Sequence, residues 1–261
     1  MADIFRFAFP RTLFDQAPEA YRLGYLMLGR LWNDCVILTR QMLTARNRPA
    51  SGFTDADGHA AIATELLNLR LLASRLHEGA ALLRQLGTFS RHWQEDLPAE
   101  AVAAVKRVRR YFSNSGAPLS RLRHTMGFHQ DADVARAALD TIGEPELFDY
   151  HGEHFATTLY MSAEVLELRA LAVLLGTETA REAINILAED ALEVLGDTDI
   201  ACQAFHSWFL NTHIVPHHPL DLGETITLTN APEHDAVIVP FFVSFHTIND
   251  GSDESTLGAA P

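Results

Sequence analysis

Cysteine is scarce in this chain of 261 residues, which contains only Cys35 and Cys202. Each lies among apolar residues in a helical pattern, so we expect two buried thiols rather than a disulfide framework, a redox pair or a metal site. The sequence also lacks a phosphate-binding glycine loop, a nucleophile elbow, a Cys-x-x-Cys pair and a dinucleotide fingerprint. These absences exclude the enzyme classes that such motifs define.

A long apolar run is absent as well. No stretch approaches the roughly 18–20 consecutive apolar residues that a membrane span requires, and residues 1–6 lack the basic start and apolar centre of a signal peptide. Apolar residues nevertheless make up 48% of the chain and charged residues 21%, which excludes a disordered chain and allows a sizeable core. We therefore expect a soluble, cytoplasmic protein that does not contact a membrane.

Acidic residues are missing from one segment of an otherwise acidic protein. The chain has 34 Asp and Glu against 20 Lys and Arg, a net charge of −14, yet residues 101–130 contain six basic residues and no acidic one. We call residues 101–130 the acid-free segment. Because every acidic residue lies elsewhere, this segment is where an anionic ligand is best tolerated. A solvated helix face that neutralises acidic neighbours, or a subunit contact, would explain the same charge pattern.

Apolar residues recur at helical spacing through most of the chain, as Tyr21, Tyr25, Leu28 and Trp32 illustrate. Proline, glycine and polar breaks separate the helical stretches. The helices that we expect cover residues 18–47, 62–89, 98–113, 118–128, 133–143, 162–176, 177–196 and 199–213. The pattern predicts a mainly α fold, an antiparallel helical bundle.

Only the C-terminal part has a β pattern. Residues 224–229 alternate polar and apolar side chains and residues 237–243 are rich in β-formers, so we expect a small C-terminal β-hairpin. We divide the chain into four parts on this basis: a helical bundle (1–145), additional helices packed on the same core (146–215), a β-hairpin appendage (216–248) and a flexible tail (249–261).

One group of polar residues in the acid-free segment is suited to chemistry. Arg123 is followed directly by His124, and His129 comes six positions after Arg123. An arginine, a polar residue and a histidine in this order resemble the Arg-polar-x4-His motif of the HEPN superfamily. That superfamily comprises all-helical proteins, many of them metal-independent ribonucleases of bacterial toxin–antitoxin, antiviral-defence and CRISPR systems.

The resemblance implies a fold and an activity. Residues 1–145 would form a HEPN-like bundle, and the protein would be an endoribonuclease that binds RNA, acts as a homodimer and answers to an inhibitory or activating protein partner. The resemblance implies no cofactor and no metal ion. A second pair, Arg70 and His77, has a related spacing, but the apolar Leu71 follows Arg70.

The residue types suit cleavage of RNA without a metal ion. The 2′-hydroxyl attacks the adjacent phosphorus, which requires a base, an acid and positive donors for the developing charge. We assign His129 as general acid or base, Arg123 as phosphate clamp, and His124 as a polar residue that orients one of them or the substrate. The other basic residues of the acid-free segment are expected to bind RNA: Lys106, Arg107, Arg109, Arg110 and Arg121.

Helical geometry separates two of these residues. On an unbroken helix Arg123 and His129 would lie about 120° apart around the axis and would not share a face. A distortion near Gly127, the reach of the arginine side chain, or two motifs facing each other in a homodimer would bring them together. Alternatively, Arg123 pairs with an acid such as Asp131 while His129 is a buried histidine with satisfied hydrogen bonds.

Two other classes of function fit the same sequence. A catalytically silent helical module would bind RNA, a nucleotide or a protein through the acid-free segment, and an assembly protein would add a strand of its β-hairpin to another chain. A metal site at His213, His217 and His218 is disfavoured because Pro216 interrupts the helix between them. The carboxylates within residues 164–193 are expected on solvated helix faces.

Overall fold

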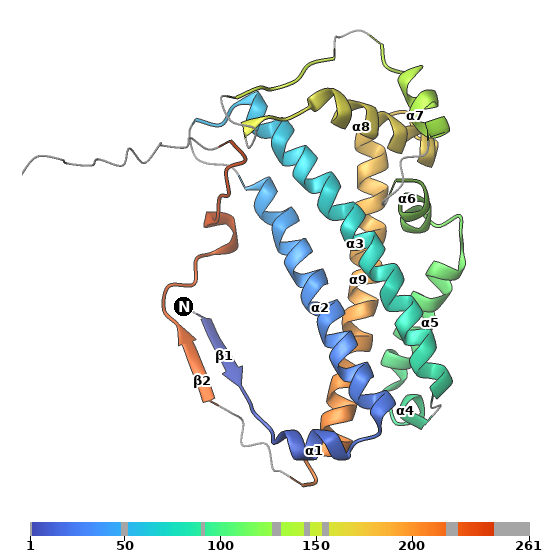
Figure 1. The fold of residues 1–261 in the computed structure, drawn as a ribbon, viewed down its shortest axis with the longest axis vertical. Helices are drawn as coiled ribbons and strands as arrows, with labels where there is room; N and C mark the ends of the chain where they lie inside the picture. The colour runs from blue at the N-terminus through green and yellow to red at the C-terminus, as the bar shows by residue number, and fades with distance from the viewer. Residues whose placement is uncertain are drawn as a thin grey trace, which may run out of the picture.

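The computed structural model describes residues 2–47, 52–89, 92–126, 132–143, 147–152, 157–217 and 224–242. Within these residues the chain is mainly α-helical with one small antiparallel sheet, which confirms the predicted fold class (Figure 1). The long helices are α2 (Glu19–Arg46), α3 (Asp55–Phe89) and α9 (Ala180–Phe209). The shorter helices are α1 (Arg11–Gln16), α4 (His92–Glu95), α5 (Ala99–Ser113), α6 (Pro118–Met126), α7 (Ala132–Leu139) and α8 (Met161–Leu175).

Helices α2 and α3 run side by side as an antiparallel pair (Figure 1). Two glycines allow their closest approach. A Cβ atom on Gly79 of α3 would stand 2.6 Å from Leu31 of α2, and a Cβ atom on Gly24 of α2 would stand 2.7 Å from Leu86 of α3. A Cβ atom at either position would force the facing leucine side chain to shift, so the two glycines make room for these leucines between the helices.

One hydrophobic core joins helices from early and late parts of the chain. Its fully buried side chains include Trp93 of α4, Leu122 of α6, and Phe205 and Phe209 of α9. Trp93 and Phe205 meet edge to face, with ring centres 5.2 Å apart. Helix α9 is therefore the element against which α2, α3, α5 and α6 all pack.

Two glycines, Gly176 and Gly196, were expected to end helices, and only Gly176 does so. Gly176 adopts a φ of +69° and closes α8, and Thr179 and Glu182 form a reciprocal capping box that begins α9. Gly196 does not end a helix, so the prediction of two helices over 177–196 and 199–213 is wrong. An interior glycine costs only about 1 kcal/mol relative to alanine, and buried residues on both sides of Gly196, such as Val194 and Ala201, hold α9 in the core.

The sheet pairs β1 (Ala2–Arg6) with β2 (Glu224–Leu228), and Ile4 lies opposite Ile226. We expected residues 224–229 to pair with residues 237–243 instead. Residues 237–242 form no strand, and Pro240 has no N–H to donate to a ladder. The true partner is far away in the chain, since Thr227 and the Asp3 carboxylate that accepts its hydrogen bond are 224 residues apart.

The remaining expectations about organisation concern the membrane and the tail. No helix within the described residues is both long and apolar enough to cross a membrane. The expected flexible tail (249–261) lies outside the described residues.

The ribbon formed by β1 and β2 lies beside the helical body (Figure 1). Its side chains Ile4, Phe5 and Leu228 are exposed.

Candidate functional site

Helix α6 carries Arg123 and His124 and is held against the core by its apolar face. Leu119 and Leu122 are fully buried, whereas Arg123 is half-buried and His124 is exposed. Pro118 suits the first position of α6 because no helical hydrogen bond requires its missing N–H. The buried leucines therefore decide in which direction Arg123 and His124 project.

His77 of α3 lies beside His124. The two ring centres are 6.0 Å apart and the rings are nearly perpendicular, at 82°. Phe112 of α5 also packs edge to face against His77, with ring centres 5.2 Å apart. Helices α3 and α6 thus place two imidazoles side by side, and α5 packs against one of them.

Positive charge surrounds His77. Burial lowers the pKa of His77, and the nearby Arg123, His124 and Arg84 lower it further, against the opposite effect of Glu78. The Nδ1 atom of His77 is buried and has no hydrogen-bond partner among the described residues. These effects favour the neutral form of the His77 imidazole. We call His77, Arg84, Arg123 and His124 the α3–α6 cluster.

The basic residues of the acid-free segment differ in their partners. The Nε atom of Arg107 on α5 donates to both carboxylate oxygens of Asp197 on α9, at 2.8 and 3.1 Å. Arg123 on α6, by contrast, forms no ion pair with an acidic side chain in the described part of the chain, and neither does Arg84 of α3, which lies outside the segment. The segment is therefore not one continuous positive surface.

The other residues predicted to bind RNA are spread over α5 and α6. Lys106 and Arg110 are exposed, whereas Arg109 and Arg121 are half-buried. The guanidinium of Arg109 lies next to Gly87 of α3. Gly87 comes three positions after Arg84, which is within one helical turn. Arg107 and Arg110 instead line a hollow of about 420 Å³ whose wall also includes Glu193 and Asp197.

His129, the predicted general acid or base, lies outside the described residues, as do Gly127 and Asp131. The expected approach of Arg123 to His129, and the alternative ion pair of Arg123 with Asp131, therefore stay predictions. What the described residues bring together is His124 and Arg123 with His77.

A buried ion pair lies on the same face of α3 as His77. The Nη1 atom of Arg70 donates to Glu167 of α8 at 2.8 Å, and the Glu167 side chain is only 11% exposed. Burial raises the pKa of Glu167 to about 7, against the lowering effect of Arg70, and burial also raises the pKa of Glu164. The expectation that these two carboxylates are solvated is wrong, because each has a buried carboxylate oxygen and Glu167 is paired with Arg70 of α3.

The two thiols are buried and unpaired, as predicted. Burial raises the pKa of both Cys35 and Cys202 to about 12, so neither is a ready nucleophile. In the described ranges, no three His, Cys, Asp or Glu side chains are grouped so as to hold a metal ion. The α3–α6 cluster is therefore the strongest candidate site.

The sequence motif set His77 aside and did not include Arg84. A signal was present, since Arg70, His77 and Arg84 follow one another at seven-residue intervals on α3. Residues seven apart share one helix face, so these three form a polar stripe. Arg70 and His77 do not match the Arg-polar-x4-His motif because the apolar Leu71 follows Arg70. Their spacing nevertheless places them on one face of a helix.

Comparisons with known proteins add no assignment. No protein-family model matches the chain, and no curated protein and no solved structure matches it significantly. The function has to be argued from the geometry and chemistry of the site.

Proposed function

We propose that this protein is a metal-independent endoribonuclease whose active site is the α3–α6 cluster. The observation that carries the proposal is the pair of imidazoles, His77 and His124, with ring centres 6.0 Å apart. Two imidazoles provide a base and an acid, and the neighbouring arginines provide phosphate-binding donors. The resemblance of residues 123–129 to the HEPN motif supports the same class of reaction.

His77 is the general base in this proposal. Its lowered pKa leaves the ring neutral, so it accepts the proton of the RNA 2′-hydroxyl. The 2′-oxygen forms a bond to phosphorus, the bond from phosphorus to the 5′-oxygen breaks, and His124 donates a proton to that leaving oxygen. The products are a 2′,3′-cyclic phosphate and a 5′-hydroxyl end.

Arg123 and Arg84 bind the non-bridging phosphate oxygens. Neither is committed to an acidic side chain of the described residues, so their N–H groups remain available to an anion. Their fixed positive charge stabilises the charge that develops on phosphorus-bound oxygens during attack.

The proposed site does not require a second subunit. His77 and His124 belong to one chain, so one protomer contains both the base and the acid. The homodimer implied by the HEPN resemblance stays a prediction. Specific activity that is independent of protein concentration would indicate a functional monomer, whereas activity that rises with concentration would indicate a dimer.

The decisive experiment compares two exposed histidines. Purified wild type, His124→Ala and His217→Ala are incubated with RNA in EDTA, and the cleaved ends are identified by mass spectrometry. Both side chains are exposed, so neither change disturbs the core. We expect 2′,3′-cyclic ends from wild type and from His217→Ala, and a rate lower by about 100- to 10,000-fold for His124→Ala.

Equal rates for wild type and His124→Ala would contradict the proposal. RNA that binds wild type without being cut, and binds Arg123→Ala more weakly, would instead identify a catalytically silent RNA-binding module. Cleavage that depends on an added divalent ion would exclude the metal-independent mechanism.

A further inference from the structure

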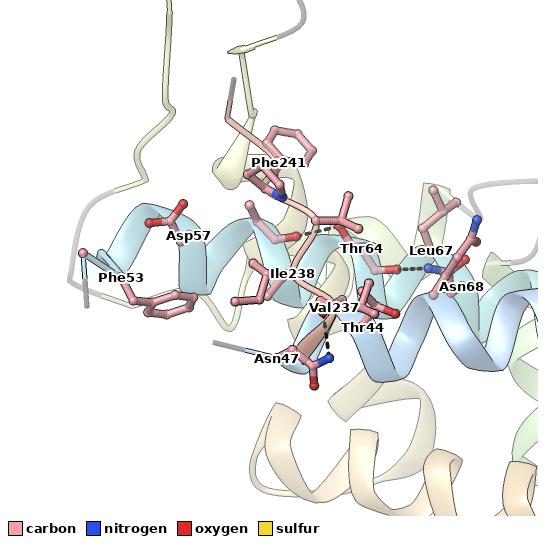
Figure 2. Close-up of a pocket in the computed structure, with 17 residues that line it drawn as sticks. Thr44, Asn47, Phe53, Asp57, Thr64, Leu67, Asn68, Val237, Ile238 and Phe241 are labelled. Atoms are coloured by element: carbon pink, nitrogen blue, oxygen red, sulfur yellow. Dashed lines mark hydrogen bonds between the residues drawn. The ribbon is translucent and has the colours of Figure 1, made fainter. Parts of the chain in front are cut away.

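A cavity of about 750 Å³ lies between the end of α2, the start of α3 and residues 237–241. Figure 2 shows Val237 and Ile238 crossing between the two helices, with Thr44 and Asn47 on one side and Thr64 on the other. Cavities of this volume are typical of small-molecule sites. Thr64 and His77 are 13 positions apart on one helix, roughly 20 Å along its axis, so this cavity is separate from the α3–α6 cluster.

Small side chains form the helical walls of the cavity. Ala45, Ala60, Ala61 and Thr64 all line it, and their short side chains leave the volume open. Larger apolar side chains lie at the same place and remain partly exposed, with Leu67 at 48% and Ile238 at 42%. An apolar surface that is concave and exposed favours an apolar ligand.

Residues 237–241 close one side of the cavity. The Nδ2 atom of Asn47, directly after α2, donates to the carbonyl oxygen of Val237 at 2.8 Å (Figure 2). Phe241 lines the cavity at the other end of this segment. The closing segment is thus anchored to α2 at one end.

The charge of the lining restricts the ligand. Asp57 is the one charged residue among the described residues that line the cavity. The backbone N–H and the hydroxyl of Thr54 both donate to its Oδ2 atom, at 2.9 and 2.7 Å, and these bonds hold the pKa of Asp57 below its usual range. Asp57 therefore caps the start of α3, where its charge is already balanced by the helix dipole.

We propose that the cavity binds an uncharged amphiphile, with an apolar body and one hydroxyl or amide group. No basic side chain among the described lining residues would balance an anion, which disfavours phosphates and carboxylates. The Thr44 hydroxyl donates to the carbonyl oxygen of Arg40, and the Asn68 amide donates to that of Thr64. The side-chain oxygen atoms of these two lining residues are therefore suited to accept a hydrogen bond from one head group. This site is independent of the proposed ribonuclease activity.

Binding of the neutral dye Nile red to the full-length protein tests the proposal. We expect saturable fluorescence enhancement by wild type, affinity at least tenfold weaker for Ala61→Phe, which fills the cavity, and unchanged affinity for Ala81→Phe, an exposed position on the same helix. Thr64→Leu is a second filling variant in case Ala61→Phe does not fold. In competition, 1-octanol should displace the dye at concentrations at least tenfold lower than octanoate or octylamine.

Three outcomes would overturn the proposal. The first is no saturable dye binding to wild type. The second is binding that the folded filling variants leave unchanged. The third is displacement by octanoate or octylamine as effective as displacement by 1-octanol, which would indicate a site for a charged ligand.

Discussion

The acid-free segment contains two regions with the same kind of side chain in different surroundings. Between α5 and α9, the Nε and Nη2 atoms of Arg107 donate three hydrogen bonds to the buried Asp197. Between α3 and α6, Arg123 and Arg84 both lower the pKa of His77, which packs against His124, and Arg123 has no acidic partner in the part of the chain that the structure describes. A run of basic residues keeps its charge available to an anion only where the fold leaves that charge unneutralised.

The largest expected effect on the rate of RNA cleavage distinguishes two partly buried histidines, His77 and His213. Burial lowers the pKa of both His77 and His213, and each has a buried ring nitrogen without a hydrogen-bond partner among the described residues. Only for His77 do neighbouring arginines also lower the pKa. We expect His77→Gln to lower the rate of RNA cleavage by about 100- to 10,000-fold, because the general base is lost, and His213→Gln to leave it nearly unchanged.

Single-turnover cleavage rates, with circular dichroism to verify folding, measure this difference. Equal losses in the two variants would mean that burial alone explains both histidines. His77 would then not act as the general base, and the arginines near it would not mark a catalytic site.

A smaller effect on kcat/KM is expected to distinguish Arg123 from Arg107. Arg123→Ala removes a donor available to phosphate, and hydrogen bonds to charged groups contribute about 1.5–3 kcal/mol, so we expect kcat/KM to fall by about 10- to 100-fold. Arg107→Ala should leave kcat/KM nearly unchanged, because its donors already face Asp197. It should lower the Tm instead, since a largely buried carboxylate loses its partner.

Steady-state kinetics and thermal unfolding of the two variants test this division. The interpretation fails if Arg107→Ala reduces kcat/KM as much as Arg123→Ala does. The paired arginine would then also contact the substrate.

The smallest effect is on the pH profile. A base must be neutral to act, so kcat/KM should rise with pH through the pKa of His77, which lies below the ordinary histidine value. Arg84→Gln removes one of the positive charges that lower this pKa, while Arg123, His124 and Glu78 still face the ring. The rising limb of the profile should therefore move to higher pH.

The matched control for this measurement is Arg110→Gln, which changes an exposed arginine that has no part in the surroundings of His77. The rising limb of its profile should lie at the same pH as that of wild type. A rising limb that moves equally in both variants, or that moves to lower pH in Arg84→Gln, would contradict His77 as the base.

Sequence patterns predicted most helices and one side of the candidate site. Pro18 and Pro98 precede α2 and α5, and Gly176 follows α8, because these residues restrict or free the backbone locally. The same reasoning failed at Gly196, where burial on both sides outweighs a weak local preference. It also failed for β1, whose partner lies at the other end of the described chain.

The residues of the candidate site also differ in whether the sequence could predict them. Arg123 and His124 are adjacent in the sequence and were predicted together, whereas His77 belongs to another helix and joins them only through packing. The buried Glu167 was misjudged because a helical pattern shows which residues share a face, but not which helix covers that face.

The sequence by itself determined the mainly α fold, the burial of both thiols and the position of the acid-free segment, since periodicity and composition act over a few residues. Only the tertiary structure decided which arginine meets an acid and which meets a histidine. Those partners come from helices distant in the chain, and the strength of a charge interaction depends on the distance and burial that packing sets.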